Sequence, residues 1–208
     1  MAVDAYCMFI PYTGKSPESE SQVDFSNNNE QLAKEFKGGT SMQLSGGKIS
    51  SFGTIFEIED YSFDIEQTIN IGSQSGGTGA GKVTFNAFSI TRKIDQASPV
   101  LFEQCCGGSA FKQVSIALRK SGGEAASGGS STMTSGVVFV RFDFKLVAVK
   151  TISWAHDDES PKETVTFDYG GLLIRYNAQN PDGSLYSSVK QGGWNRVKNR
   201  VDQTTDPI

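Results

Sequence analysis

The feature that most constrains the fold is a period of two in the apolar residues, which recurs along the chain. The clearest run has apolar residues on one parity and charged residues on the other: Val138, Val140, Phe142, Phe144 and Leu146 against Arg141, Asp143 and Lys145. Successive side chains of a strand point to opposite faces, so this run predicts a strand with one face in the core and one in water. The run continues to Trp154, which is long for a strand and predicts a bend or bulge.

Shorter alternating runs predict further strands, at residues 4–11, 61–71, 83–90, 114–118 and 165–176. Two of these runs change phase. The change between Ala87 and Phe88 predicts a β-bulge. The second change follows Gly170 and Gly171, where a strand would kink at a barrel corner.

Helical signals are few. Ser98 is suited to cap a helix, Pro99 to occupy its first position and Gly107 to end it. A weaker signal covers residues 29–36. The prediction is therefore a mainly β fold, a compact two-sheet β-barrel or sandwich with one α-helix packed alongside.

The 208 residues fit one domain, 1–208, in which the Gly-rich stretches 72–81 and 122–136 are loops between strands. A net charge of −4 argues against a general nucleic-acid binder, which needs a basic face. No apolar run reaches the length of a membrane span, so no membrane insertion is expected. Residues 1–12 lack the basic start of a signal peptide, which predicts a protein that begins in the cytoplasm.

The three cysteines, Cys7, Cys105 and Cys106, are too few for a disulfide framework. Two of them are adjacent in sequence, and a bridge between neighbours is strained. The sequence predicts that all three are buried free thiols.

One loop approaches a phosphate-binding motif. Residues 76–82 end in Gly81 and Lys82, but Val83 stands where a hydroxyl should reach Mg²⁺. The residues that follow alternate like a strand, whereas a phosphate loop precedes a helix. An interstrand loop available to a partner is the favoured interpretation.

The other candidate sites are weak. His156 is the only histidine and precedes three acids, a pattern typical of a solvated hairpin turn and poor for a metal site. No nucleophile has a base beside it, so no enzyme activity, cofactor or metal is predicted. Glu57 and Glu59 share a wet strand face, and the basic tail Arg196, Lys198 and Arg200 is a solvated end or a partner contact.

An ordered series of short motifs is more specific than any one of them. It comprises the start Met1 to Asp4, the triplet Gly14-Lys15-Ser16, residues 79–83, residues 94–99 with Cys105, the run Ala117-Leu118-Arg119-Lys120-Ser121-Gly122-Gly123, and the pairs Asp182-Gly183 and Gly193-Trp194. In this order the motifs resemble the Hcp (haemolysin co-regulated protein) family, the tube protein of bacterial type VI secretion. The resemblance runs through nearly the whole chain and is strongest over residues 63–123.

The resemblance implies a structural subunit whose hexameric rings stack into a hollow tube. The implied partners are other copies of the chain, a spike protein at the tip, a contractile sheath outside and small effector proteins in the lumen, with secretion through the apparatus itself. It also implies a ring-stacking loop: Gly72, Ser73, Gln74, Ser75, Gly76, Gly77, Thr78, Gly79, Ala80, Gly81 and Lys82.

The chain departs from the family pattern at two places. Residues 23–50 are longer than usual, which predicts an insertion, and Ala110-Phe111 stand where the family often has a histidine. The residues that follow Trp194 are too few for an added toxin domain. Two alternatives remain: a monomeric β-sandwich that binds a small ligand or carbohydrate, and a nucleotide hydrolase that uses Lys82.

Overall fold

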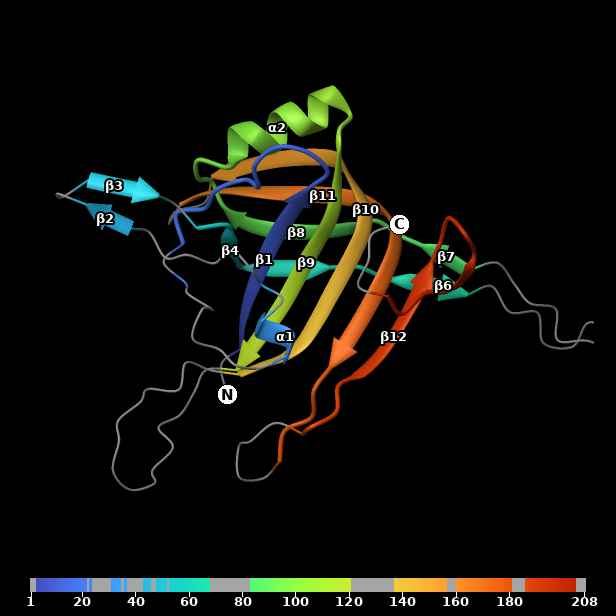
Figure 1. Ribbon diagram of the computed structural model, residues 1–208. Coiled ribbons are helices and arrows are strands. Elements are labelled where there is room, and N and C mark those ends of the chain that lie inside the picture. The colour runs from blue at the N-terminus through green and yellow to red at the C-terminus, as the bar shows by residue number, and fades with distance from the viewer. Residues whose placement is uncertain are drawn as a thin grey trace, which may run out of the picture.

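The computed structural model describes residues 3–21, 23, 31–34, 36, 43–45, 48–51, 53–67, 83–120, 137–156, 160–180 and 186–204. Thirteen strands and two helices lie in these ranges (Figure 1). The strands are β1 (Val3–Pro11), β2 (Gln43–Ser45), β3 (Lys48–Ser51), β4 (Ile55–Ile58), β5 (Asp60–Ser62), β6 (Ile65–Gln67), β7 (Val83–Phe85), β8 (Phe88–Lys93), β9 (Ala110–Lys120), β10 (Val137–His156), β11 (Pro161–Tyr176), β12 (Lys190–Asn195) and β13 (Arg200–Val201). The helices are α1 (Gln31–Lys34) and α2 (Ser98–Gly107).

Nine of these strands form one antiparallel sheet that folds over itself. Its main order is β13-β12-β11-β10-β9-β1-β4, and β8 pairs with both β11 and β5. The pairs β2–β3 and β6–β7 are separate hairpins. Because the order runs from β13 to β4 without closing among the described strands, the sandwich alternative is the correct one and the closed barrel is not formed.

The long strands β10 and β11 belong to both layers. The first half of β10 pairs with β9, and its second half pairs with the part of β11 that also pairs with β8. The corner lies at Leu146, whose φ of 50° is left-handed, opposite Gly170. A Cβ on Gly170 would lie 3.1 Å from Leu146, so a glycine gives the close approach that the corner needs. The predicted corner at the Gly pair is therefore present.

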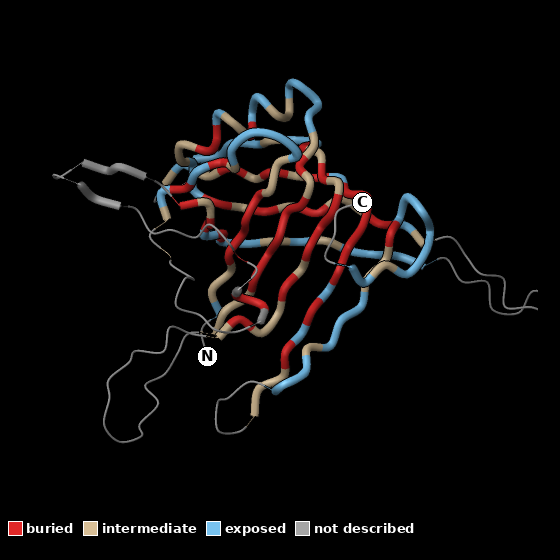
Figure 2. Tube along the Cα trace, in the orientation of Figure 1, coloured by how far each residue is buried: buried red, intermediate tan, exposed pale blue. Residues whose placement is uncertain are grey.

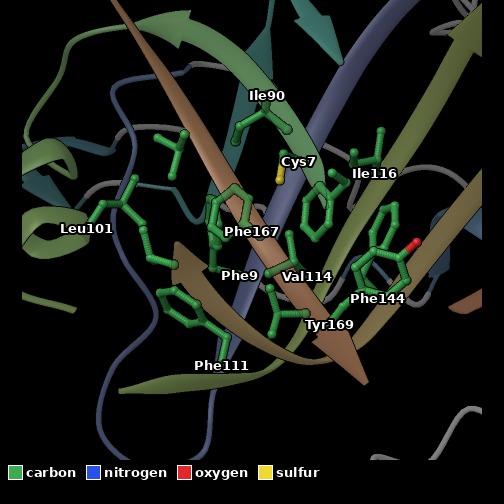
Figure 3. Close-up of a cluster of buried hydrophobic side chains, with 14 of the residues drawn as sticks. Cys7, Phe9, Ile90, Leu101, Phe111, Val114, Ile116, Phe144, Phe167 and Tyr169 are labelled. Carbon is green, nitrogen blue, oxygen red and sulfur yellow. The ribbon is translucent and has the colours of Figure 1, made fainter. Parts of the chain in front are cut away.

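The core lies between the two layers and is rich in phenylalanine (Figure 3). Phe88 from β8 stacks on Phe144 from β10 at 3.9 Å and on Phe167 from β11 at 4.7 Å. All three are fully buried, and burying such a ring contributes about 1.5–3 kcal/mol. Leu101 of α2 is also fully buried in this cluster, so the helix packs on the sheet as predicted. The predicted mainly β, two-layer fold with a helix alongside is confirmed.

The prediction that one side of β10 faces water is wrong. Arg141, Asp143 and Lys145 are 2%, 1% and 2% exposed. They point away from the phenylalanine core, but residues from two remote segments cover them: Leu32 accepts a hydrogen bond from Arg141, and Thr204 accepts one from Lys145. The outer face of the sheet is thus buried at these residues as well, and Figure 2 shows long buried stretches along the central strands.

The phase change at Phe88 has another cause than the expected bulge. The chain leaves β7 at Phe85 and begins β8 at Phe88, and β7 pairs with β6 whereas β8 pairs with β11 and β5. The two parities therefore belong to two strands in different sheets. The weak helix expected at residues 29–36 is present as α1, with Leu32, Ala33 and Phe36 buried.

Both ends of α2 differ by one residue from the prediction. Ala97 is the N-cap and has no side-chain cap, while Gly108 ends the helix in the left-handed conformation at φ 64°. Asp95 satisfies the Ala97 N–H, at 2.8 Å. The Ser98 hydroxyl accepts hydrogen bonds from the Asp95 N–H and from Arg92.

The cysteines are free thiols, but only Cys7 is buried; Cys105 is half-buried and Cys106 is exposed. The prediction of three buried thiols is wrong at Cys106, which lies on the solvent side of the last turn of α2, whereas Cys105 in the same turn packs against the core. Burial raises the pKa of Cys7 to about 12.

We expect a maleimide reagent at pH 8 to label Cys106 rapidly and Cys7 only after unfolding, because the thiolate is the reactive form and access is required. Peptide mass spectrometry after timed quenching measures both rates. Labelling of Cys7 in the folded protein at a rate near that of Cys106 would contradict the burial described here.

Candidate functional site

The predicted stacking loop, Gly72 to Lys82, lies outside the described residues, as does most of the expected insertion at 23–50. The strands on either side of the loop, β6 and β7, pair with each other in register Ile65↔Phe85. Val83 begins a strand and not a helix, so the context that a phosphate-binding loop requires is missing.

His156 lies at the end of β10 opposite Pro161 of β11, which confirms a hairpin at this position. The three acids that follow it lie outside the described residues. Within the described ranges, no group of three or more potential ligands could hold a metal ion.

An apolar groove of about 1030 Å³ lies beside β12. Its walls come from the β6–β7 hairpin on one side and from β11 and β12 on the other, and they include Ile65, Val83, Phe85, Ile174, Tyr176 and Trp194. Lys190, Gln191 and Asn199 add polar groups. Ile65, Ile174 and Tyr176 are 42%, 38% and 45% exposed, which is high for large apolar side chains. Sequence reasoning predicted strands at β6, β7 and β11 but neither β12 nor the groove, because the strands that form the groove are far apart in the chain.

The basic tail lies next to this groove. Lys198 and Arg200 are exposed at the turn from β12 to β13, and Arg196 pairs with Asp168 at 2.9 Å. Position 193 in β12 requires glycine, because a Cβ there would overlap the main-chain oxygen of Asp202, which follows β13. Asp202 itself turns inward: hydrogen bonds from Thr204 lower its pKa to about 2, and Lys145 lies 3.9 Å away.

A buried ion network crosses the outer face of the sheet. Asp143 accepts hydrogen bonds from Arg141 at 2.8 Å, from Arg175 at 2.5 Å and from Ser115 at 2.5 Å. Arg141 also lies over the ring of Phe36, 4.8 Å from its centre. Burial alone would raise the pKa of Asp143, but the two arginines and the Ser115 hydrogen bond hold it below its usual value. The carboxylate is therefore a structural anion and not a proton donor.

A second buried pair fastens α2 to the sheet. Arg92 of β8 donates to Glu163 of β11 at 2.7 Å and to Asp95 at 2.8 Å, just before the helix. The other Glu163 oxygen accepts the indole N–H of Trp154 at 3.1 Å. These charged groups are each satisfied by partners within the fold, so they position elements and do not form a reactive centre.

The family described as "Type VI secretion system effector, Hcp" matches residues 48–176, more than half of the chain. No curated protein matches the chain. In the described residues, no helix is long and apolar enough to cross a membrane.

Solved structures share the fold at low sequence identity. A protein described as a type six secretion system protein is 17% identical, with a TM-score of 0.70 over 97% of this chain and 100% of its own. Hcp1 from Salmonella typhimurium is 16% identical, with a TM-score of 0.61 over 97% and 100% of the two chains. The secreted protein Hcp3 from Pseudomonas aeruginosa is 13% identical, with a TM-score of 0.54 over 93% and 98%.

Proposed function

Because this chain belongs to the Hcp family of the type VI secretion system, we propose that it is a subunit of the hollow inner tube of that system. The observation that carries the proposal is the family match over residues 48–176, which contain most of both layers of the sheet. The role is structural, and it needs surfaces that bind other copies of the chain.

A tube of identical copies requires two kinds of contact. One contact closes a ring, which we propose has six members, and a second, head-to-tail contact stacks rings without closing. A ring contact of about 1,000 Å² or more gives stable closure. Stacking contacts can be weaker one by one, since six of them act together. The loop from Gly72 to Lys82 is proposed for stacking, and its position in the sequence between the paired strands β6 and β7 supports this role.

The same proposal assigns the partners. A spike protein caps the tube, a contractile sheath surrounds and expels it, and small effector proteins travel in the lumen, so that the subunit leaves the cytoplasm through the apparatus. The satisfied buried charges and the thiols described above give no support to an enzyme.

Electron microscopy of the purified protein, with light scattering to give its mass, tests the proposal. We expect annular particles with sixfold symmetry and a central hole, and a mass near six subunits. Particles of single-subunit mass at the highest soluble concentration would contradict it. A variant without residues 72–82 is expected to keep the rings and lose the stacks.

The alternative of a monomeric ligand-binding module draws support from the aromatic side chains Phe85, Tyr176 and Trp194 in the groove. It predicts a monomer whose Trp194 fluorescence changes on addition of an apolar ligand or a saccharide. The tube proposal predicts rings whether or not such a ligand is present.

A further inference from the structure

The main path of the folded sheet has two different ends. β4 is the last strand in one direction and β13 the last in the other, and the two ends lie on opposite sides of the body (Figure 1). A ring of identical copies needs two unlike surfaces on each copy, placed on opposite sides. The two ends of this sheet also differ in charge.

The end at β12 and β13, here named the basic edge, carries Lys190, Lys198 and Arg200, all exposed. The nearby carboxylate of Asp202 is bound by Thr204 and faces Lys145, so it does not neutralise the exposed cations. The apolar groove opens beside this edge, and Lys190 lies in its lining. Glu66 points away from the groove, because its strand neighbours Ile65 and Gln67 line it.

The side of the body at β4 and the start of β5, here named the acidic edge, carries Glu18, Glu20, Glu57 and Asp60, all exposed. Two contacts hold the segment of Glu18 and Glu20 beside β4: a β-bridge joins Ser19 to Gly53, and the Ser21 hydroxyl donates to Glu57 at 3.4 Å. Within the described residues 3–21 and 53–67, Lys15 is the only basic residue. Lys162 approaches this side but pairs with Glu59 at 3.0 Å.

We propose that the acidic edge of one copy docks on the basic edge and groove of the next, and that this contact closes the ring. The proposal rests on the proposed function and names the surfaces that it uses. An apolar centre with a charged rim is the usual anatomy of a specific interface. Opposite charges at the rim fix the direction of the contact, because two like edges repel each other. Every copy then presents a basic edge to one neighbour and an acidic edge to the other.

Two charge-reversal variants test the contact at low ionic strength, where surface charges are least screened. The first combines Lys198→Glu with Arg200→Glu, so that both edges are acidic. The second combines Glu18→Lys, Glu20→Lys and Glu57→Lys, so that Asp60 is the one acid of the four that remains and both edges are basic. Each variant alone is expected to lose rings by about tenfold or more relative to the wild type, as measured by light scattering and electron microscopy.

Mixing the two variants in equal amounts is expected to restore rings, because acidic and basic copies can alternate around a ring with an even number of members. Circular dichroism melting of each variant shows that the loss is not unfolding. A control that combines Lys112→Glu with Lys150→Glu makes the same change in net charge as the first variant, at residues outside both edges, and it is expected to form rings as the wild type does.

The outcomes separate this contact from the tube proposal. If the wild type forms rings and each variant does so equally well, the charged edges are not the ring contact, although the tube proposal stands. If the variants fold and lose rings but form none when they are mixed, the proposed contact between the acidic and basic edges is also wrong. If the wild type forms no rings, the proposed function fails, and the contact with it.

Discussion

Replacing Asp143 with alanine is expected to destabilise the protein by about 3–5 kcal/mol, which is a large part of the stability of a typical domain. The reason is that Arg141 and Arg175 are both almost fully buried and both bind this carboxylate. Removing it leaves two guanidinium groups in the outer layer without that counter-charge. Urea unfolding, followed by circular dichroism, measures the change.

Asp168→Ala is the matched control, because Asp168 pairs with Arg196 at the surface, where both side chains are about half exposed. Its expected effect is below about 1 kcal/mol. A triple variant, Arg141→Met, Asp143→Leu and Arg175→Met, should be more stable than Asp143→Ala, since it removes the charges together. Equal losses for Asp143→Ala and Asp168→Ala would contradict the buried network.

The pH dependence has a definite sign. The folded protein holds the pKa of Asp143 below its usual value, so the carboxylate stabilises the fold at all pH values above its unfolded pKa of about 3.9. That contribution is lost as the pH falls through the folded pKa. The difference in unfolding free energy between wild type and Asp143→Ala should therefore be constant near neutral pH and shrink only below about pH 4.

Glu163→Ala is expected to cost about 3 kcal/mol and to loosen α2 before the rest of the fold. Glu163 is fully buried and binds Arg92, which also holds Asp95 and Ser98 at the start of the helix. Urea unfolding gives the free energy, and hydrogen exchange of residues 98–107 reports the helix.

Glu59→Ala is the control for this prediction. Glu59 pairs with Lys162, the residue next to Glu163, but both members of that pair are about a third exposed. Its expected cost is below about 1 kcal/mol. Unchanged exchange of α2 in Glu163→Ala would show that the buried pair does not fasten the helix.

The long strands β1, β9, β10 and β11 and the main helix could be predicted from the sequence because alternation, Pro99 and the glycines at the helix end act locally, whereas β4, β12 and β13 were not predicted. The burial of the charged face of β10 could not be predicted from the sequence. Alternation shows that the two faces of a strand differ, but the cover over Arg141 and Lys145 comes from Leu32 and Thr204, which are remote in sequence. The charged residues on one face of β10 were therefore predicted to face water, whereas in the fold they are buried and form ion pairs.

The candidate surfaces were predictable only in part. The acids Glu57 and Glu59 and the basic residues Lys198 and Arg200 are plain in the sequence. That they form two separate charged surfaces follows only from the strand order, which places β4 and β13 at opposite ends of the main path of the sheet. The groove depends on the fold in the same way, since Ile65 and Phe85 come together with Trp194 only in the folded chain.

The corner at Leu146 and Gly170 has a mechanical consequence. Because β10 and β11 run without a break from one layer into the other, covalent main chain joins the two layers along their length. A load applied to one layer passes into the other along two continuous strands and does not pull the layers apart at a seam. The two layers are therefore expected to move together as one stiff block.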